Sequence, residues 1–270
     1  MGSINTSIGI IGAGSMGSAI ARGLVKSGAL EPANVVVCDP LASCTEPLAE
    51  FGMRAVSDAR ELVEAATDVV LIAVKPQVLA DVCAPLASML EGRLVVSIAA
   101  GVALATLEEL LPGARIVRVM PNLPIQVLSG ATAVCAGSQA TSEDVELVRS
   151  LFAQLGAAHV MREDQLDAEG AVVSCGPAYV ALFIDALTRA GILRGLPAVA
   201  CRELVEATVL GVAQTLLQTG EHPRAYMERV TSPGGTTAAA LKELEPLLVE
   251  GVYEAVDAAL ERTAELAEGR

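Results

Sequence analysis

Near the start of the chain, Gly12-Ala13-Gly14-Ser15-Met16-Gly17 has the glycine spacing of a phosphate-binding turn. It follows the uncharged run Ile8–Ile11 and precedes a helical pattern over 16–26. In such a unit the first glycine permits a tight turn, the second lets the backbone approach a pyrophosphate, and the third lets helix and strand pack closely. The helix N-terminus attracts the phosphates. We therefore expect a dinucleotide site at Ile11, Gly12, Gly14, Ser15, Met16 and Gly17, with a glycine-rich turn that binds nothing as the alternative.

Asp39 follows the next uncharged run, Val35–Cys38, and lies 22 residues after Gly17. A carboxylate at this position accepts hydrogen bonds from the adenosine ribose and repels a 2′-phosphate. No Lys or Arg lies between Lys26 and Arg54, so no cation close in sequence would hold that phosphate. The pattern favours NAD(H) as the cofactor, and NADP(H) stays the alternative.

The apolar runs at 69–74 and 94–98 lead into residues that are suited to line a ligand crevice. The carboxyl ends of parallel strands border that crevice, and small residues at 99–101 would let a nicotinamide ring approach the backbone. Pro76 fixes the chain beside Lys75, which favours a crevice position over an ordinary surface lysine. We expect cofactor contacts from Ala73, Val74, Lys75, Pro76, Ala99 and Ala100.

A second cradle is predicted far along the chain, at Thr231-Ser232-Pro233-Gly234-Gly235-Thr236-Thr237, directly before an apolar helical segment. A Pro-Gly-Gly turn with hydroxyls at a helix N-terminus offers several N–H and O–H donors to an anion. A substrate carboxylate is the natural occupant, and a simple capped turn between helices is the alternative. The expected substrate-binding residues are Ser232, Gly234, Gly235, Thr236 and Thr237.

The elements that must position these residues divide the chain in two. Short β-branched runs at Ile8–Ile11, Val35–Cys38, 69–74, 94–98, 116–120 and 157–161 alternate with helical patterns at 16–26, 43–51, 59–66, 78–90, 104–111 and 142–155. This alternation predicts an α/β domain, a doubly wound and mostly parallel Rossmann sheet, over residues 1–164. Residues 165–270 show helical spacing only, with breaks at Gly195-Leu196-Pro197, His222-Pro223, Ser232–Gly235 and Glu245-Pro246.

The amino-acid composition limits the kinds of partner that the protein is expected to bind. Hydrophobic residues make up 53% of the chain and the mean hydropathy is +0.53, which fits either a membrane or large subunit interfaces. The longest uncharged stretch, 119–142, is broken by prolines and glycines, so we expect no membrane span and favour an oligomer. A net charge of −14 argues against nucleic acid. Without a CxxC pair or a His cluster we expect no metal, and without a secretory signal we expect a cytoplasmic protein.

Five motifs together resemble the pyrroline-5-carboxylate reductases in order and spacing: Gly12–Gly17, Ala73–Pro76, Arg118-Val119-Met120-Pro121-Asn122, Gly176-Pro177-Ala178-Tyr179 and Thr231–Thr237. The resemblance covers residues 7–268. It implies a Rossmann domain followed by an all-helical C-terminal dimerisation domain, with dimers that often assemble into decamers. It also implies reduction of L-1-pyrroline-5-carboxylate, a cyclic imino acid, to L-proline with NAD(P)H, the last step of proline biosynthesis.

The resemblance assigns roles to individual residues. Ser232, Thr236 and Thr237 match the residues that hold the substrate carboxylate, Glu163 matches an acid near the imine ring, and Ile98, Ala99, Ala100 and Asn122 match cofactor contacts. The chain departs from the family at Leu123 and at Val173-Ser174-Cys175, where Thr and Ser-Gly-Ser are usual, so a six-membered imine stays an alternative substrate. Asp39 departs from relatives that use NADPH.

We expect a catalytic pair, Thr237 and Glu163. A cyclic iminium carbon is already electrophilic, so holding it in place against the cofactor supplies most of the rate. Thr237 or a water would donate to the ring nitrogen, and Glu163 would stabilise its positive charge. A β-hydroxyacid dehydrogenase would need a lysine on the helix near 179–193, where none occurs, and a non-catalytic dinucleotide sensor would not need the 231–237 turn.

Overall fold

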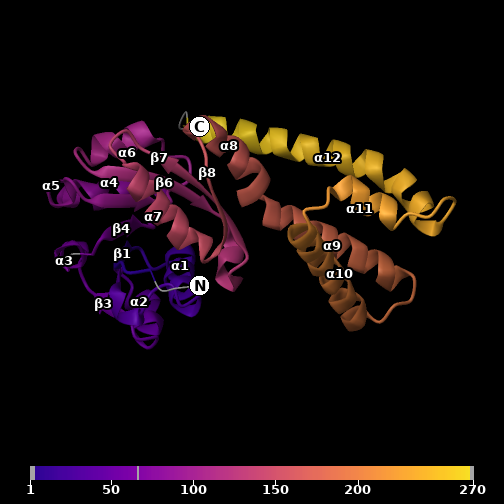
Figure 1. Cartoon of the computed structure of the whole chain (residues 1–270), viewed down its shortest axis with the longest axis horizontal. Helices are drawn as coiled ribbons and strands as arrows, with labels where there is room; N and C mark the ends of the chain where they lie inside the picture. Colours follow the sequence, from indigo (N-terminus) through magenta and orange to yellow (C-terminus); the bar gives the residue numbers. More distant parts are fainter. Residues whose placement is uncertain (1–3, 66, 268–270) are drawn as a thin grey trace. The chain divides into compact units, whose positions relative to one another are not determined.

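Eight strands form one sheet in a computed structural model that describes residues 4–65 and 67–267 (Figure 1). The ends of the two predicted domains, 1–3 and 268–270, and Ala66, the last residue of a predicted helix, lie outside the described residues. The strand order is β3-β2-β1-β4-β5-β6-β7-β8. Strands β6 and β7 pair antiparallel, and the other neighbours pair parallel. The strands are β1 (Ile8–Ile11), β2 (Val35–Cys38), β3 (Arg54–Val56), β4 (Val69–Ile72), β5 (Leu94–Ser97), β6 (Arg115–Pro121), β7 (Gly130–Ala136) and β8 (Gly156–Val160).

Helices cover both faces of this sheet, because alternate strand residues point to opposite sides and both sides are apolar. Ile8 and Ile10 of β1 lie in one hydrophobic cluster, and Ile11 lies in the other. The first cluster includes residues of α1 (Ser15–Lys26), α2 (Ala42–Ala49) and α7 (Ser142–Ala153). The second includes residues of α3 (Ala59–Glu64), α4 (Pro76–Cys83), α5 (Ala87–Leu90) and α6 (Leu104–Leu110). The expected mostly parallel Rossmann sheet is confirmed.

Two strands and one helix boundary differ from the sequence expectation. Strands β3 and β7 were not predicted, because β3 has only three residues and β7 falls in a stretch rich in glycine and alanine. The single helix expected over 78–90 is divided into α4, a short 3₁₀ turn at Ala84–Leu86, and α5. Pro85 explains this division, because proline lacks the N–H that would continue the α-helical ladder.

The C-terminal part of the chain is helical, as expected. It comprises α8 (Leu166–Glu169), a π-helical turn (Gly170–Ser174, here the π-turn), α9 (Gly176–Leu193), α10 (Ala198–Thr219), α11 (Pro223–Arg229) and α12 (Thr236–Ala267). The predicted breaks before α10, α11 and α12 are confirmed. The break expected at Glu245-Pro246 is wrong, because α12 continues through Pro246. A proline inside a helix costs one backbone hydrogen bond, and the long helix tolerates it.

Backbone contacts divide the chain into two compact units, residues 1–174 with 260–270 (unit 1) and 175–259 (unit 2). The change of unit at Ser174 lies ten residues beyond the expected domain boundary near residue 164. That boundary stays a prediction, because compactness alone does not decide where independently folding domains begin.

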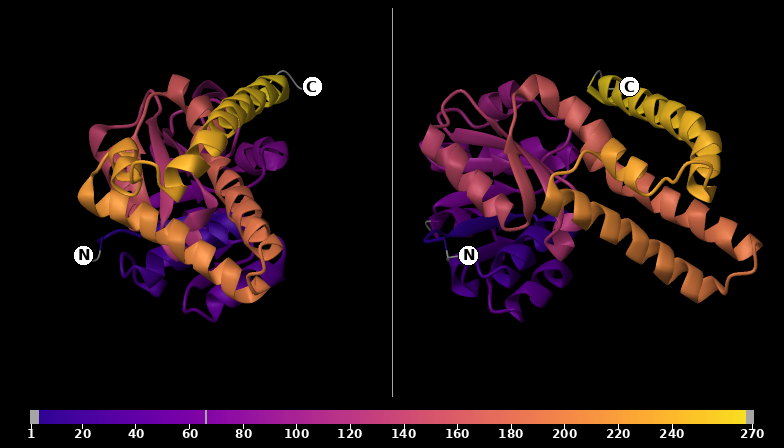
Figure 2. Two further views of the ribbon diagram at one scale, coloured as in Figure 1. Left: turned by 90° about the vertical axis from the view of Figure 1, so that its right-hand side faces the viewer. Right: turned by 45° about the vertical axis from the view of Figure 1, so that its right-hand side comes forward.

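Unit 2 has almost no core of its own within the described residues. Only Thr188, Cys201 and Val205 are buried there, whereas seventeen of the twenty-four exposed large hydrophobic side chains belong to it. Unit 2 comprises α9, α10, α11 and α12 as far as residue 259, and these helices are seen from three sides in Figures 1 and 2. By length and composition alone the helical run Glu163–Leu193 could also cross a membrane, a segment that the sequence analysis did not single out. Exposed apolar surface of this extent is typical of a protein–protein or membrane interaction site.

Candidate active site

The glycine loop between β1 and α1 has the geometry that its sequence predicts. Gly12 has φ +99°, a backbone conformation that favours glycine. A Cβ at Gly17 would lie 1.9 Å from the Gly12 carbonyl oxygen, so only glycine lets α1 begin this close to the strand. A Cβ at Gly14, in contrast, would meet nothing within 4 Å. The loop is therefore closed on the protein side and open at Gly14, as a phosphate cradle requires.

Asp39 fixes this loop from the neighbouring strand. Its Oδ2 accepts a hydrogen bond from the Ala13 N–H at 2.8 Å, and its Oδ1 accepts one from the Leu41 N–H at 2.9 Å. A carboxylate has about four lone-pair directions, so both oxygens retain the capacity to accept from a ribose. Asp39 thus holds the backbone of the glycine loop in place by hydrogen bonding, a role that the sequence pattern did not predict.

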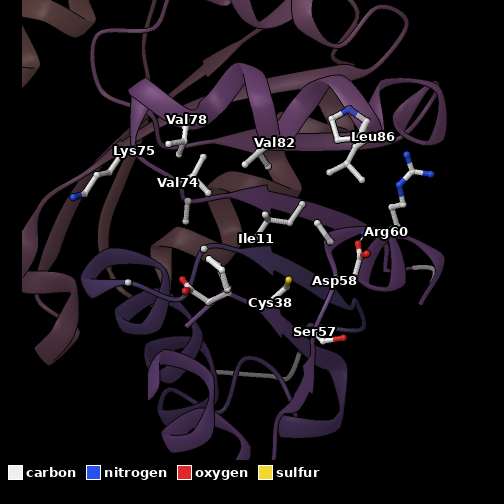
Figure 3. Close-up of a pocket in the computed structure, with 17 residues that line it drawn as sticks. Ile11, Cys38, Ser57, Asp58, Arg60, Val74, Lys75, Val78, Val82 and Leu86 are labelled. Atoms are coloured by element: carbon white, nitrogen blue, oxygen red, sulfur yellow. Dashed lines mark hydrogen bonds between the residues drawn. The ribbon is translucent and has the colours of Figure 1, made fainter. Parts of the chain in front are cut away.

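A pocket of about 560 Å³ opens at this edge of the sheet (Figure 3). This volume falls in the usual range for small-molecule sites. Seven predicted cofactor residues line it: Ile11, Gly12, Gly14, Asp39, Ala73, Val74 and Lys75. The other predicted cofactor residues do not line this pocket, and they are Ser15, Met16, Gly17, Pro76, Ile98, Ala99, Ala100 and Asn122.

The residues outside the pocket follow the ends of strands β1, β4, β5 and β6, at the same edge of the sheet. Ser15, Met16 and Gly17 form the first turn of α1, and Pro76 is the first residue of α4. Residues 98–100 follow β5, and the Ile98 N–H donates to the Ile72 carbonyl of β4 at 3.2 Å. All of them occupy carboxyl ends of parallel strands, where ligands of open α/β sheets bind.

The pocket also contains residues that sequence reasoning missed. Ser57, Asp58 and Arg60 follow the unpredicted strand β3, and Val78, Val82 and Leu86 face them from α4 and the following turn (Figure 3). Arg60 adds a cation to the pocket that the search of neighbours in sequence, between Lys26 and Arg54, did not cover. Burial is the main cause that raises the pKa of the Cys38 thiol, and the negative charges of Asp58 and Asp39 raise it further. The thiol therefore lies in the pocket in its protonated form.

Asn122, expected as a cofactor contact, has both side-chain polar atoms engaged within the protein. Its Nδ2 donates to the Val173 carbonyl at 3.2 Å, and its Oδ1 accepts from the Ala131 N–H at 2.8 Å. The side chain is buried. Asn122 therefore joins the end of β6 to β7 and to the π-turn, and any contact with a cofactor stays a prediction.

Glu163 is paired with a buried arginine. Its Oε1 accepts from Arg118 Nη1 at 3.1 Å and from the Leu104 N–H at 2.6 Å. The Arg118 side chain is 5% exposed and that of Glu163 is 37% exposed. The pair fixes Glu163 against the start of α6. Glu163 belongs to unit 1, and its expected role beside the substrate remains a prediction.

The five expected substrate residues in unit 2 lie on one turn between α11 and α12. The Gly235 N–H donates to the Ser232 carbonyl at 3.0 Å, and Gly234 has φ +70°. A Cβ at Gly235 would meet Ser232 Oγ, and the positive φ of Gly234 favours glycine, so both glycines suit this shape. Thr236 and Thr237 begin α12, where the first N–H groups of a helix have no partner within it. The turn therefore offers backbone and hydroxyl donors together.

The two histidines occupy the positions expected of surface or capping residues. His222 Nδ1 accepts from the Arg224 N–H at 3.2 Å at the start of α11, and His159 is exposed on β8. Among residues 4–65 and 67–267, no group of three or more His, Cys, Asp or Glu side chains is placed to hold a metal.

A doubly wound sheet, a glycine cradle and a lined pocket define the class of protein, a dinucleotide-binding oxidoreductase. Two family models match the chain, "NADP oxidoreductase coenzyme F420-dependent" over residues 7–101 and "Pyrroline-5-carboxylate reductase dimerisation" over residues 163–266. The chain is 38% identical to a pyrroline-5-carboxylate reductase of Methanosarcina acetivorans, over 97% of this chain and 98% of the relative. It therefore belongs to the pyrroline-5-carboxylate reductase family.

Solved structures agree with this assignment. A pyrroline-5-carboxylate reductase from Coxiella burnetii matches with a TM-score of 0.92 at 34% identity, covering 98% of this chain and 99% of that one. A pyrroline carboxylate reductase from Plasmodium falciparum with NADP bound matches with a TM-score of 0.86 at 30% identity, covering 98% of this chain and all of the other.

The two glycines of the cradle predict separable defects. Gly17→Ala should lower the melting temperature and abolish NADH binding, because its Cβ collides with the Gly12 carbonyl. Gly14→Ala should keep the melting temperature within about 2 °C, since little stability changes at an open site, yet weaken binding at least tenfold. Differential scanning fluorimetry and NADH fluorescence titration measure the two effects. Unchanged binding in Gly14→Ala would contradict the assignment of the cradle.

Proposed function

We propose that this chain reduces L-1-pyrroline-5-carboxylate to L-proline, using NADH or NADPH, as the last step of proline biosynthesis. The carrying observation is the presence in one chain of the Gly12–Gly17 cradle and the Ser232–Thr237 turn, each with the backbone geometry of an anion site. Identity of 38% over 97% of the chain to a pyrroline-5-carboxylate reductase supports the same activity.

The residues at the sheet edge fit a nicotinamide dinucleotide. Its pyrophosphate would rest on the Gly12–Gly14 backbone and the start of α1, and its adenosine would enter the pocket between Asp39 and Val78. When bound, such a cofactor supplies the hydride of the reduction. Most of the pocket wall is apolar, and Asp39, Asp58, Arg60 and Lys75 add charged groups that could contact the nucleotide.

The turn before α12 would bind and orient the substrate. The substrate carboxylate would accept from the first N–H groups of α12, that of Thr237 included, and from the hydroxyls of Ser232 and Thr236. Charge-assisted bonds of this kind fix a small ring in one orientation, and orientation contributes most of the rate for an electrophilic imine. A Thr237 hydroxyl or a water donates to the ring nitrogen.

Glu163 stabilises the positive charge that the ring nitrogen carries. Its ion pair with Arg118 and its bond to the Leu104 N–H hold the carboxylate in a fixed place, which supports an electrostatic role. Such a group acts by its position, without transferring a proton itself.

The active form is a homodimer, with assembly into a decamer as the family often shows. The match of residues 163–266 to a dimerisation model and the exposed apolar side chains of unit 2 support this arrangement. A second copy covers these side chains better than lipid, because charged groups such as Arg189, Arg202 and Glu206 are interspersed among them. The compartment is the cytoplasm, and neither nucleic acid nor membrane is a partner.

NADH is the favoured cofactor, on the strength of Asp39. We expect turnover of pyrroline-5-carboxylate with NADH to exceed that with NADPH, and the six-membered piperideine analogue to be slower. Asp39→Asn keeps one acceptor oxygen and removes the charge, so the NADH-to-NADPH ratio of kcat/KM should fall about tenfold, equivalent to ~1.4 kcal/mol. Arg60→Ala is the matched variant at another charged residue of the same pocket. Absence of turnover with either imine would contradict the proposed reaction, and faster turnover with NADPH would contradict only the role of Asp39.

Thr237→Ala should lower kcat/KM for the imine by about 100-fold, the lower end for loss of a positioned donor. Thr231→Ala is the matched control, because the Thr231 hydroxyl donates to the Met227 carbonyl at 2.6 Å and serves the end of α11. Steady-state kinetics with both variants separate the two hydroxyls. Undiminished kcat/KM in Thr237→Ala would remove Thr237 from the mechanism.

Association should be visible in solution. A chain of 27.6 kDa should sediment at no less than twice that mass at micromolar concentration. Leu247→Asp, at a side chain that is 72% exposed on α12, should shift the population toward monomer, because it places a charge in an apolar interface. Phe51→Asp, on an exposed residue of unit 1, is the control. A monomeric wild-type protein in analytical ultracentrifugation would rule out the dimer.

A further inference from the structure

Glu169, the last residue of α8, carries a carboxyl group that the mechanism above does not use. The residue is 7% exposed, although acidic side chains are rarely buried without a cation. Its Oε2 lies 3.3 Å from Ser174 Oγ, which donates to it. Burial, opposed by this hydrogen bond, raises the pKa of Glu169 to about 7.

The Glu169–Ser174 bond spans the π-turn. Glu169 immediately precedes the turn and Ser174 is its last residue, so the hydrogen bond joins the two ends of the turn across residues 170–173. Single π-helical turns are uncommon and occur mostly where function displaces a helix from regular geometry. Ser174 is also the last residue of the first segment of unit 1.

The π-turn packs against the end of β6. Asn122 Nδ2 donates to the Val173 carbonyl at 3.2 Å, and a Cβ at Gly170 would lie 3.2 Å from Met120 Sδ. Met120 and Asn122 flank the last residue of β6, at the edge of the sheet where the cofactor residues gather. The shape of the π-turn and the position of Asn122 are therefore linked by direct contacts.

No charged partner compensates Glu169 within the described residues. The titratable and charged groups on the neighbouring segments are the Arg162–Asp164 and Arg118–Glu163 pairs, Asp167 of α8, Cys175 and Tyr179 of α9. Arg118 is committed to Glu163, and Asp167 is exposed. Ionised Glu169 would thus be a buried anion held by one hydroxyl, and its hydration would require the turn to open.

We propose that Glu169, in its protonated form, is a positioning residue that keeps the π-turn against the end of β6 and so holds Asn122 in place at the cofactor edge. Ionisation loosens the turn. Because the carboxyl holds its proton more tightly in the folded chain than in the unfolded one, stability falls as pH rises from about 4.5 to about 7 and is level above. The kinetic consequence rests on the proposed reductase function, whereas the consequence for stability does not.

The test compares wild type with Glu169→Gln, which keeps the shape and a hydrogen bond to Ser174 but cannot ionise. Melting temperature, NADH affinity, kcat and KM are measured between pH 5.5 and 8.5. The wild-type value of kcat/KM, divided by that of Glu169→Gln, should fall about tenfold from pH 6 to pH 8, and titration of the imine cancels in this ratio. Asp167→Asn, which removes an acid from the same helix, should follow wild type.

Ser174→Ala gives a directional check. The Ser174 hydrogen bond lowers the pKa of Glu169, so its removal should move the midpoint of the pH profile upward. Coincident wild-type and Glu169→Gln profiles would overturn the inference. If Glu169→Gln does not fold, a wild-type melting temperature that does not fall between pH 5 and pH 7 would overturn it as well. A pH-dependent gap in melting temperature and NADH affinity without any turnover would support the inference and reject the proposed reaction.

Discussion

Parallel pairing in register is the constraint on which the cofactor site depends. Ile11 lies beside Cys38 on one side and Ile72 on the other, and Ile72 lies beside Ser97. The strands therefore end together, and whatever follows them meets at one edge, although the segments are separated by many residues along the chain. The glycine turn, Asp39, the Ala73–Pro76 segment and residues 98–100 share no local sequence relation. Their common neighbourhood is a consequence of strand register alone.

Sequence pattern succeeds where one element carries its own signal. Ile8–Ile11 and Val35–Cys38 have the predicted bounds because each is uncharged, β-branched and buried on both faces. Strand β3 has two exposed residues out of three and no such signal. Because β3 was not predicted, the part of the pocket wall that contains Ser57 and Arg60 was not predicted either. Likewise, the glycines of the 231–237 turn predict an anion site, but no sequence pattern reveals that both polar atoms of Asn122 are satisfied within the protein.

In unit 2 the helices were predictable from local sequence signals, but the surroundings of their apolar side chains were not. Helical spacing and turn residues locate α9 to α12 well, because those signals are local. Helix α12 nevertheless continues past Pro246, so a breaker residue was overridden by the helix around it. The apolar side chains of this unit have few partners in their own chain. In the proposed homodimer their hydrophobic free energy would be realised on association, and the stability of this unit would then depend on protein concentration.

Asp39 combines two tasks that are separate in a simpler site, since the same carboxylate anchors Ala13 of the glycine loop and faces the expected ribose. Any replacement that welcomes a 2′-phosphate also loosens the loop that must bind the pyrophosphate. A change of coenzyme by a single mutation would therefore reduce catalytic efficiency with both nucleotides before a second mutation restored the loop. Under the proposed use of NADH, a redesign toward NADPH would have to begin with a substitute anchor for the N–H groups of residues 13 and 41.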